Sequence, residues 1–181
     1  MFLLDWINYI LQALGLSNKE AKIVVLGLDN AGKSTLVHKL CKNEVHAFVP
    51  TTKAQAQTFT LGGVEFTAWD LGGHEQVRDL WEEYYAGADG IVFMVDSADA
   101  GRLGEARKEL KDLLSHESLE GVPLLVLGNK SDLPGSKGRG ELLEGLGLDL
   151  DADQRPMELA MSSLIAGTGY HEGFRWLSGF L

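Results

Sequence analysis

The chain carries Gly27-Leu28-Asp29-Asn30-Ala31-Gly32-Lys33-Ser34, a complete G-x-x-x-x-G-K-[ST] phosphate-binding loop. It lies between a short β-branched apolar run, residues 22–27, and a helical pattern over residues 33–41. The glycines let backbone N–H groups converge on phosphates, and the following helix presents its N-terminus to the same anion. We expect Lys33 to lie between the β- and γ-phosphates and Ser34 to bind Mg²⁺. The residues expected at the nucleotide from this loop are Asp29, Asn30, Ala31, Gly32, Lys33, Ser34 and Thr35.

Strand and helix patterns alternate on either side of this loop. Strands are predicted at residues 22–27, 58–61, 64–70, 90–96, 122–128 and 157–161. Helices are predicted at residues 33–41, 75–85, 102–115, 139–146 and 170–180. Gly62-Gly63 favours a hairpin between the second and third strands. The pattern predicts an α/β fold of the P-loop NTPase type: a doubly wound, six-stranded, mostly parallel sheet with helices on both faces. Ligands of such sheets bind at the carboxyl ends of the strands.

A second motif, Asp70-Leu71-Gly72-Gly73, follows the third predicted strand. We expect Asp70 to reach Mg²⁺ through a water molecule and Gly73 to offer its amide to the γ-phosphate. The next residue is His74, whose side chain could orient the attacking water, so it is the catalytic candidate. A lone loop histidine is otherwise a solvated surface residue.

The polar segment before this motif contains Pro50-Thr51-Thr52. A threonine that reaches Mg²⁺ only when the γ-phosphate is present is what a switch segment requires. We assign this role to Thr51, as a ligand of both nucleotide and metal, although spacing alone does not separate it from Thr52.

The third motif, Asn129-Lys130-Ser131-Asp132, predicts which base is bound. The Asp132 carboxylate can accept hydrogen bonds from the N1–H and N2–H₂ groups of guanine. Adenine presents an acceptor at N1, which a buried carboxylate would oppose. Lys130 would lie along the base, and Ser163-Leu164 could offer a backbone N–H to the guanine oxygen. The three motifs together indicate a switch that binds GTP and GDP with Mg²⁺.

The first sixteen residues differ from the rest of the chain. Residues 1–14 are apolar except for Asp5, Asn8 and Gln12, which share one narrow stripe at about 100° per residue. The segment lacks the basic start of a signal peptide and is shorter than the roughly 20 residues that span a bilayer. Phe2 excludes N-myristoylation, which needs glycine there. We therefore expect an amphipathic membrane-binding helix over residues 1–18, or one that docks on its own domain, and a GTP-binding domain over residues 19–181.

Composition limits the partners. The formal charge of −10 excludes nucleic acid as an expected partner, since phosphate backbones need clustered Lys and Arg. The single cysteine, Cys41, excludes an intramolecular disulfide and fits a reducing cytosol. We expect it to be a small filler on the inner face of a helix.

Several segments resemble the Sar family, in the Arf/Sar branch of the small Ras-like GTPases. They are residues 27–33, His74 after Asp70-Leu71-Gly72-Gly73, the apolar start with Phe2, residues 155–158 and residues 169–178. The resemblance covers nearly the whole chain.

The resemblance implies a GTP-hydrolysing switch that initiates COPII coats for transport from the endoplasmic reticulum to the Golgi. The resemblance also implies that the N-terminal helix is stowed in the GDP state, and that in the GTP state the hairpin slides by two residues and releases the helix into the membrane. A two-residue slip keeps each side chain on its face of the sheet. The implied partners are membrane lipid through residues 1–16, coat subunits that include a GTPase activator supplying an arginine, and a membrane-bound exchange factor. The implied location is the cytosolic face of the endoplasmic reticulum and Golgi.

Two other interpretations stay open from the residues themselves. One is an Arf-like GTPase with other effectors. The other is a GTP-binding module that hydrolyses negligibly and works by occupancy alone.

Overall fold

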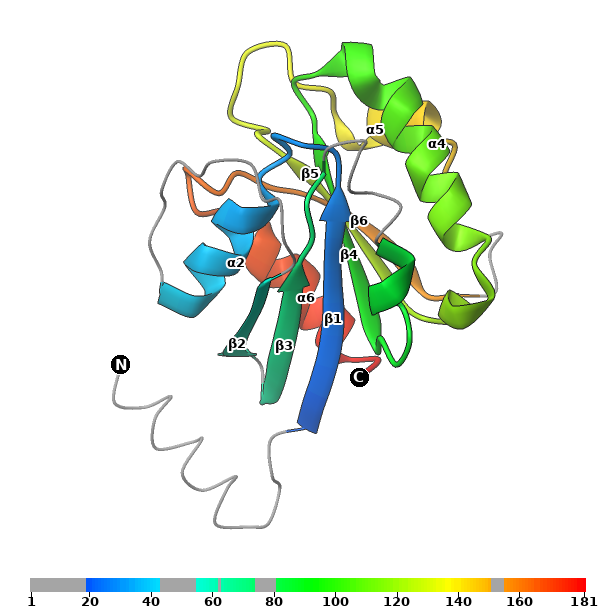
Figure 1. Cartoon of the computed structure of the whole chain (residues 1–181). Helices are drawn as coiled ribbons and strands as arrows, with labels where there is room; N and C mark the ends of the chain where they lie inside the picture. The colour runs from blue at the N-terminus through cyan, green and yellow to red at the C-terminus, as the bar shows by residue number, and fades with distance from the viewer. Residues whose placement is uncertain (1–18, 43–54, 62, 74–80, 151–154) are drawn as a thin grey trace.

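The computed structural model describes residues 19–42, 55–61, 63–73, 81–150 and 155–181 (Figure 1). Its centre is a six-stranded sheet in the order β2-β3-β1-β4-β5-β6, in which only β2 runs antiparallel to its neighbour. The strands are β1 (Lys19–Gly27), β2 (Gln55–Leu61), β3 (Val64–Asp70), β4 (Gly90–Asp96), β5 (Leu124–Asn129) and β6 (Met157–Met161). The predicted sheet is thereby confirmed, whereas the predicted helix at the start of the chain lies outside the described residues.

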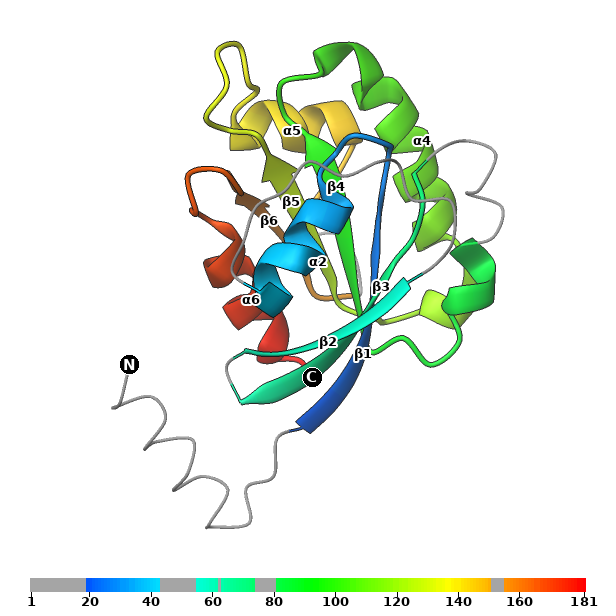
Figure 2. The same ribbon diagram turned by 60° about the vertical axis from the view of Figure 1, so that its left-hand side comes forward.

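The helices lie on both faces of the sheet (Figures 1 and 2). They are α2 (Lys33–Lys42), α4 (Leu103–Leu114), α5 (Arg139–Leu146) and α6 (Tyr170–Ser178), with short 3₁₀ helices η1 (Trp81–Tyr84), η2 (Ala100–Arg102) and η3 (Glu117–Leu119). One buried cluster joins α4, α5 and η1 to the sheet, and a second joins α2 and α6 to the other face. Strand residues alternate between the two clusters; Val24 belongs to the first and Val25 to the second.

Several element ends differ from the predictions, each for a structural reason. β1 begins at Lys19 because it pairs with β3 from the Lys19–Val64 register onward. β2 likewise extends back to Gln55, opposite Asp70. β5 begins after Pro123, which has no N–H to donate to a ladder. Of the helix predicted at residues 75–85, the described part is η1 alone.

Three phenylalanine rings join the hairpin to α6. Phe59 and Phe66 stack at 5.1 Å between centroids, and Phe174 meets both edge-on at 5.8 and 5.7 Å. Cys41 is half-buried against the same cluster, and its Sγ lies 3.6 Å from the Thr58 carbonyl oxygen. Burial raises the pKa of this thiol, partly offset by the nearby Lys42 charge. The expected filler role of Cys41 agrees with this packing.

Candidate nucleotide-binding site

The phosphate loop connects the end of β1 to the first turn of α2. Lys33 is only 6% exposed, and its Nζ donates to the Leu28 carbonyl oxygen at 2.9 Å. Ala31 is buried, Ser34 and Thr35 are half-buried, and Asn30 is exposed with a φ of 62°. The loop therefore holds its lysine against its own backbone, at the carboxyl edge of the sheet.

A glycine is required where this loop meets the base motif. Gly32 has a φ of 104°, and a Cβ there would lie 2.5 Å from Asn129 Nδ2. That amide donates to the Ala31 carbonyl oxygen at 2.9 Å, and Asn129 Oδ1 accepts from the Leu164 amide at 3.3 Å. Asn129 thus joins three loops that the sequence had suggested separately: the phosphate loop, the base motif and the loop after β6.

The Asp70-Leu71-Gly72-Gly73 segment folds against the phosphate loop. Asp70 ends β3 and is 2% exposed. The Asp29 amide donates to the Gly73 carbonyl oxygen at 3.2 Å. A Cβ on Gly73 would come within 2.3 Å of Asp29 N and 2.5 Å of Lys33 Nζ, so only glycine fits this approach. Gly73 is therefore placed beside the lysine expected at the phosphates.

The donor groups at this edge fit Mg²⁺. They are oxygens: the Asp70 carboxylate ends β3, and the Ser34 hydroxyl lies in the first turn of α2, after the loop that follows the neighbouring strand β1. Within the described ranges, no group of three or more His, Cys, Asp or Glu side chains could hold a metal ion by itself. Mg²⁺ takes one or two protein carboxylates and completes its shell from phosphates and water.

The base motif follows β5 as predicted, with two features that the sequence did not indicate. Lys130 has a φ of 62° and donates from Nζ to Asp96 Oδ2 at 2.6 Å. Asp132 is exposed, whereas the argument for guanine assumed a buried carboxylate. Because Asp132 is exposed, burial of its carboxylate would have to come from the bound base.

The loop after β6 already uses the amides that were expected to reach the guanine oxygen. Ser163 N–H donates to Thr168 O at 3.0 Å, and Leu164 N–H donates to Asn129 Oδ1. At 3.3 Å the Leu164 bond is long enough to be shared with a second acceptor. Ser162, just before them, is fully buried, and its carbonyl oxygen accepts from Ser131 N–H at 3.1 Å.

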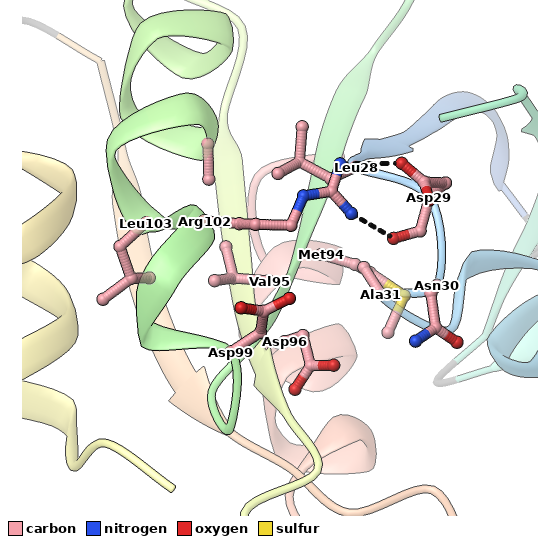
Figure 3. A pocket seen from close by; sticks show the side chains of 11 residues that line it. Leu28, Asp29, Asn30, Ala31, Met94, Val95, Asp96, Asp99, Arg102 and Leu103 are labelled. Atoms are coloured by element: carbon pink, nitrogen blue, oxygen red, sulfur yellow. Dashed lines mark hydrogen bonds and ion pairs between the residues drawn. The ribbon is translucent and has the colours of Figure 1, made fainter. Parts of the chain in front are cut away.

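The connection from β4 to α4 contributes residues that motif reading missed. Ser97 donates from N and Oγ to the Asn129 carbonyl oxygen at 2.9 and 2.7 Å. Arg102 ion-pairs with Asp29 at 2.7 Å. A pocket of about 20 Å³ lies between this connection and the phosphate loop (Figure 3), large enough for a water molecule. No short motif marks these residues, because only the tertiary fold brings them to the nucleotide loops.

Two predicted site residues, Thr51 and His74, lie outside the described residues. No described helix is long and apolar enough to cross a membrane.

Comparisons with known proteins agree with this geometry. The sequence model of the ADP-ribosylation factor (Arf) family matches residues 7–181. The chain is 41% identical to the small COPII coat GTPase SAR1 of Giardia intestinalis, with 98% of each chain covered. It is 40% identical to that of Nicotiana tabacum over 100% of both chains, and 40% identical to SAR1B of Dictyostelium discoideum over 98% of this chain and 95% of the relative.

A solved structure extends the likeness to the fold. The Arl6 (BBS3) small GTPase from Trypanosoma brucei, with bound GppNp, superimposes with a TM-score of 0.80 and 37% identity, covering 89% of this chain and 96% of that one. The predicted fold class and GTPase activity are confirmed by these matches. The chain belongs to the Arf family of small GTP-binding GTPases, and within it to the Sar group.

Proposed function

We propose that this GTPase acts as a membrane switch of the COPII coat. In the GTP state it inserts the helix of residues 1–16 into the endoplasmic reticulum membrane and recruits coat subunits there. The observation that carries the proposal is 40–41% identity, over nearly the entire chain, to three proteins named as small COPII coat GTPases. Residues 1–18 would be the membrane-binding segment and residues 19–181 the GTP-binding domain.

On the phosphate side of the site, a few residues would bind the phosphates and Mg²⁺. Lys33 would carry its charge to the β- and γ-phosphates, while Ser34 and Asp70 would hold Mg²⁺, the latter through water. Bound Mg²⁺ would neutralise phosphate charge. Thr51 would complete the metal shell only when a γ-phosphate is present, and the Gly73 amide would contact that phosphate. The close approach of Gly73 to Lys33 supports the assignment of both residues to the phosphates.

The base side would use the exposed Asp132 carboxylate to accept the two guanine donors. Lys130 would lie along the ring, with its position fixed by Asp96. A shared Leu164 amide would reach the guanine oxygen.

Hydrolysis would depend on His74 to orient the attacking water and on an arginine from an activating coat subunit. Without that arginine we expect turnover as slow as in Ras, on the order of 10⁻⁴–10⁻³ s⁻¹. The exchange factor would be membrane-bound.

The experiment measures single-turnover GTP hydrolysis on liposomes with and without purified COPII coat subunits. We expect the subunits to accelerate hydrolysis by wild type strongly. The His74→Ala variant should bind GTP but lose most of that acceleration. The His171→Ala variant, an exposed control on α6, should behave as wild type. If COPII subunits neither bind nor accelerate the GTP form, the coat assignment is wrong. If the subunits accelerate His74→Ala as much as wild type, His74 takes no part in hydrolysis and is a surface residue.

A further inference from the structure

The side chain of Arg102 contacts the phosphate loop directly. Arg102, the last residue of η2, donates from Nη2 to Asp29 Oδ1 at 2.7 Å and from Nη1 to the Asp29 carbonyl oxygen at 3.4 Å (Figure 3). Asp29 is the one acidic residue of the Gly27–Ser34 loop. The guanidinium therefore hydrogen-bonds both the backbone carbonyl and the side-chain carboxylate of Asp29 in this loop.

The orientation of this guanidinium is fixed from the opposite side. Glu105, in the first turn of α4, accepts from Arg102 Nε at 2.8 Å and from Nη2 at 3.3 Å. The planar fork of arginine suits such paired acceptors, whereas a lysine ammonium presents a single point charge. The two side chains of the Arg102–Asp29 pair are 33% and 27% exposed, so solvent screens the pair only in part. The hydrogen bonds that Arg102 donates to Glu105 and then to Asp29 raise the pKa of Arg102.

The position of Asp29 links the Arg102–Asp29 ion pair to nucleotide binding. Its amide donates to the Gly73 carbonyl oxygen, so its backbone lies beside the residue proposed to contact the γ-phosphate. A carboxylate released on this loop would add a negative charge near the phosphate anion, and like charges at this range repel. The γ-phosphate, which only GTP carries, would be affected most.

We propose that Arg102 is a positioning residue of the phosphate loop, which holds the Asp29 carboxylate on the α4 side and so favours GTP relative to GDP. The inference rests on the proposed function, because it takes this loop as the site of the phosphates.

The test compares dissociation constants for GDP and a non-hydrolysable GTP analogue, both with Mg²⁺, on the full-length chain. Arg102→Ala should lower the GTP-to-GDP affinity ratio by about three- to tenfold at low salt and by less at high salt. Arg102→Lys, which keeps the charge but loses the planar fork, should recover only part of that ratio. In an Asp29→Asn background the Arg102→Ala change should alter the ratio less than about twofold. Arg107→Ala, an exposed arginine farther along α4, is the matched control and should leave it unchanged.

An equal loss of GDP and GTP affinity that persists in the Asp29→Asn background would overturn the proposal, since Arg102 would then support only the fold. Thermal melting of each variant separates misfolding from this result. Failure of wild type to bind GTP would contradict the proposed function itself, and is thereby distinguished from failure of the Arg102 role.

Discussion

At the residue scale, the choice of base rests on the Asp132 carboxylate. Asp132→Asn replaces a pure acceptor with a group that also donates, so a donor would face the guanine N–H groups. We expect GTP affinity to fall and xanthosine triphosphate, which presents a carbonyl at that position, to be favoured. Competition binding with the two triphosphates and ATP measures the change. GTP affinity equal to wild type would remove Asp132 from the base site.

The motif residues could be predicted from the sequence because their chemistry is local. The phosphate loop needs its glycines and lysine within eight positions, and the structure places Lys33 and Gly73 together as that chemistry requires. Arg102, Asp96 and Ser97 could not be predicted, since their partners lie 73, 34 and 32 residues away. The exposure of Asp132 was also missed, because spacing does not report which side chains a loop leaves uncovered.

At the scale of elements, local signals defined some segments better than others. α5 spans Arg139–Leu146 as predicted, because Glu141 caps the Gly138 amide at 2.9 Å and Gly147 ends the helix with a φ of 66°. The apolar run of β4 likewise has the predicted bounds. The starts of β1 and β2 were predicted three residues too late, because residues 19–21 and 55–57 are mostly polar and are defined as strand by their pairing with β3.

At this scale, the contact between the hairpin and α6 can be tested by mutation. Phe174 is fully buried against Phe59 and Phe66. We expect Phe174→Ala to lower the free energy of unfolding by about 3–5 kcal/mol, through lost burial and the cavity left behind. Phe180→Ala, at a ring that is 50% exposed, should cost less than about 1 kcal/mol. Urea denaturation of both variants measures the difference, and similar values would contradict the packing described.

At the scale of the whole molecule, a GTPase domain follows an apolar N-terminal segment. Residues 1–16 include eleven large apolar or aromatic side chains, and a side chain of this kind contributes roughly 1.5–3 kcal/mol when fully buried. Insertion of half that surface would be ample for reversible membrane binding. No Lys or Arg precedes Lys19, so the binding should depend only weakly on salt. Permanent exposure of this surface would favour aggregation, which is the physical reason to expect control by the nucleotide.

Liposome flotation tests this coupling most directly. Full-length protein and a variant that lacks residues 1–16 are each loaded with GDP or a non-hydrolysable GTP analogue and floated at low and high salt. We expect only the full-length protein in the GTP state to float, with little change between the two salt concentrations. Flotation of the shortened protein, or equal flotation of the full-length protein in both nucleotide states, would contradict this coupling.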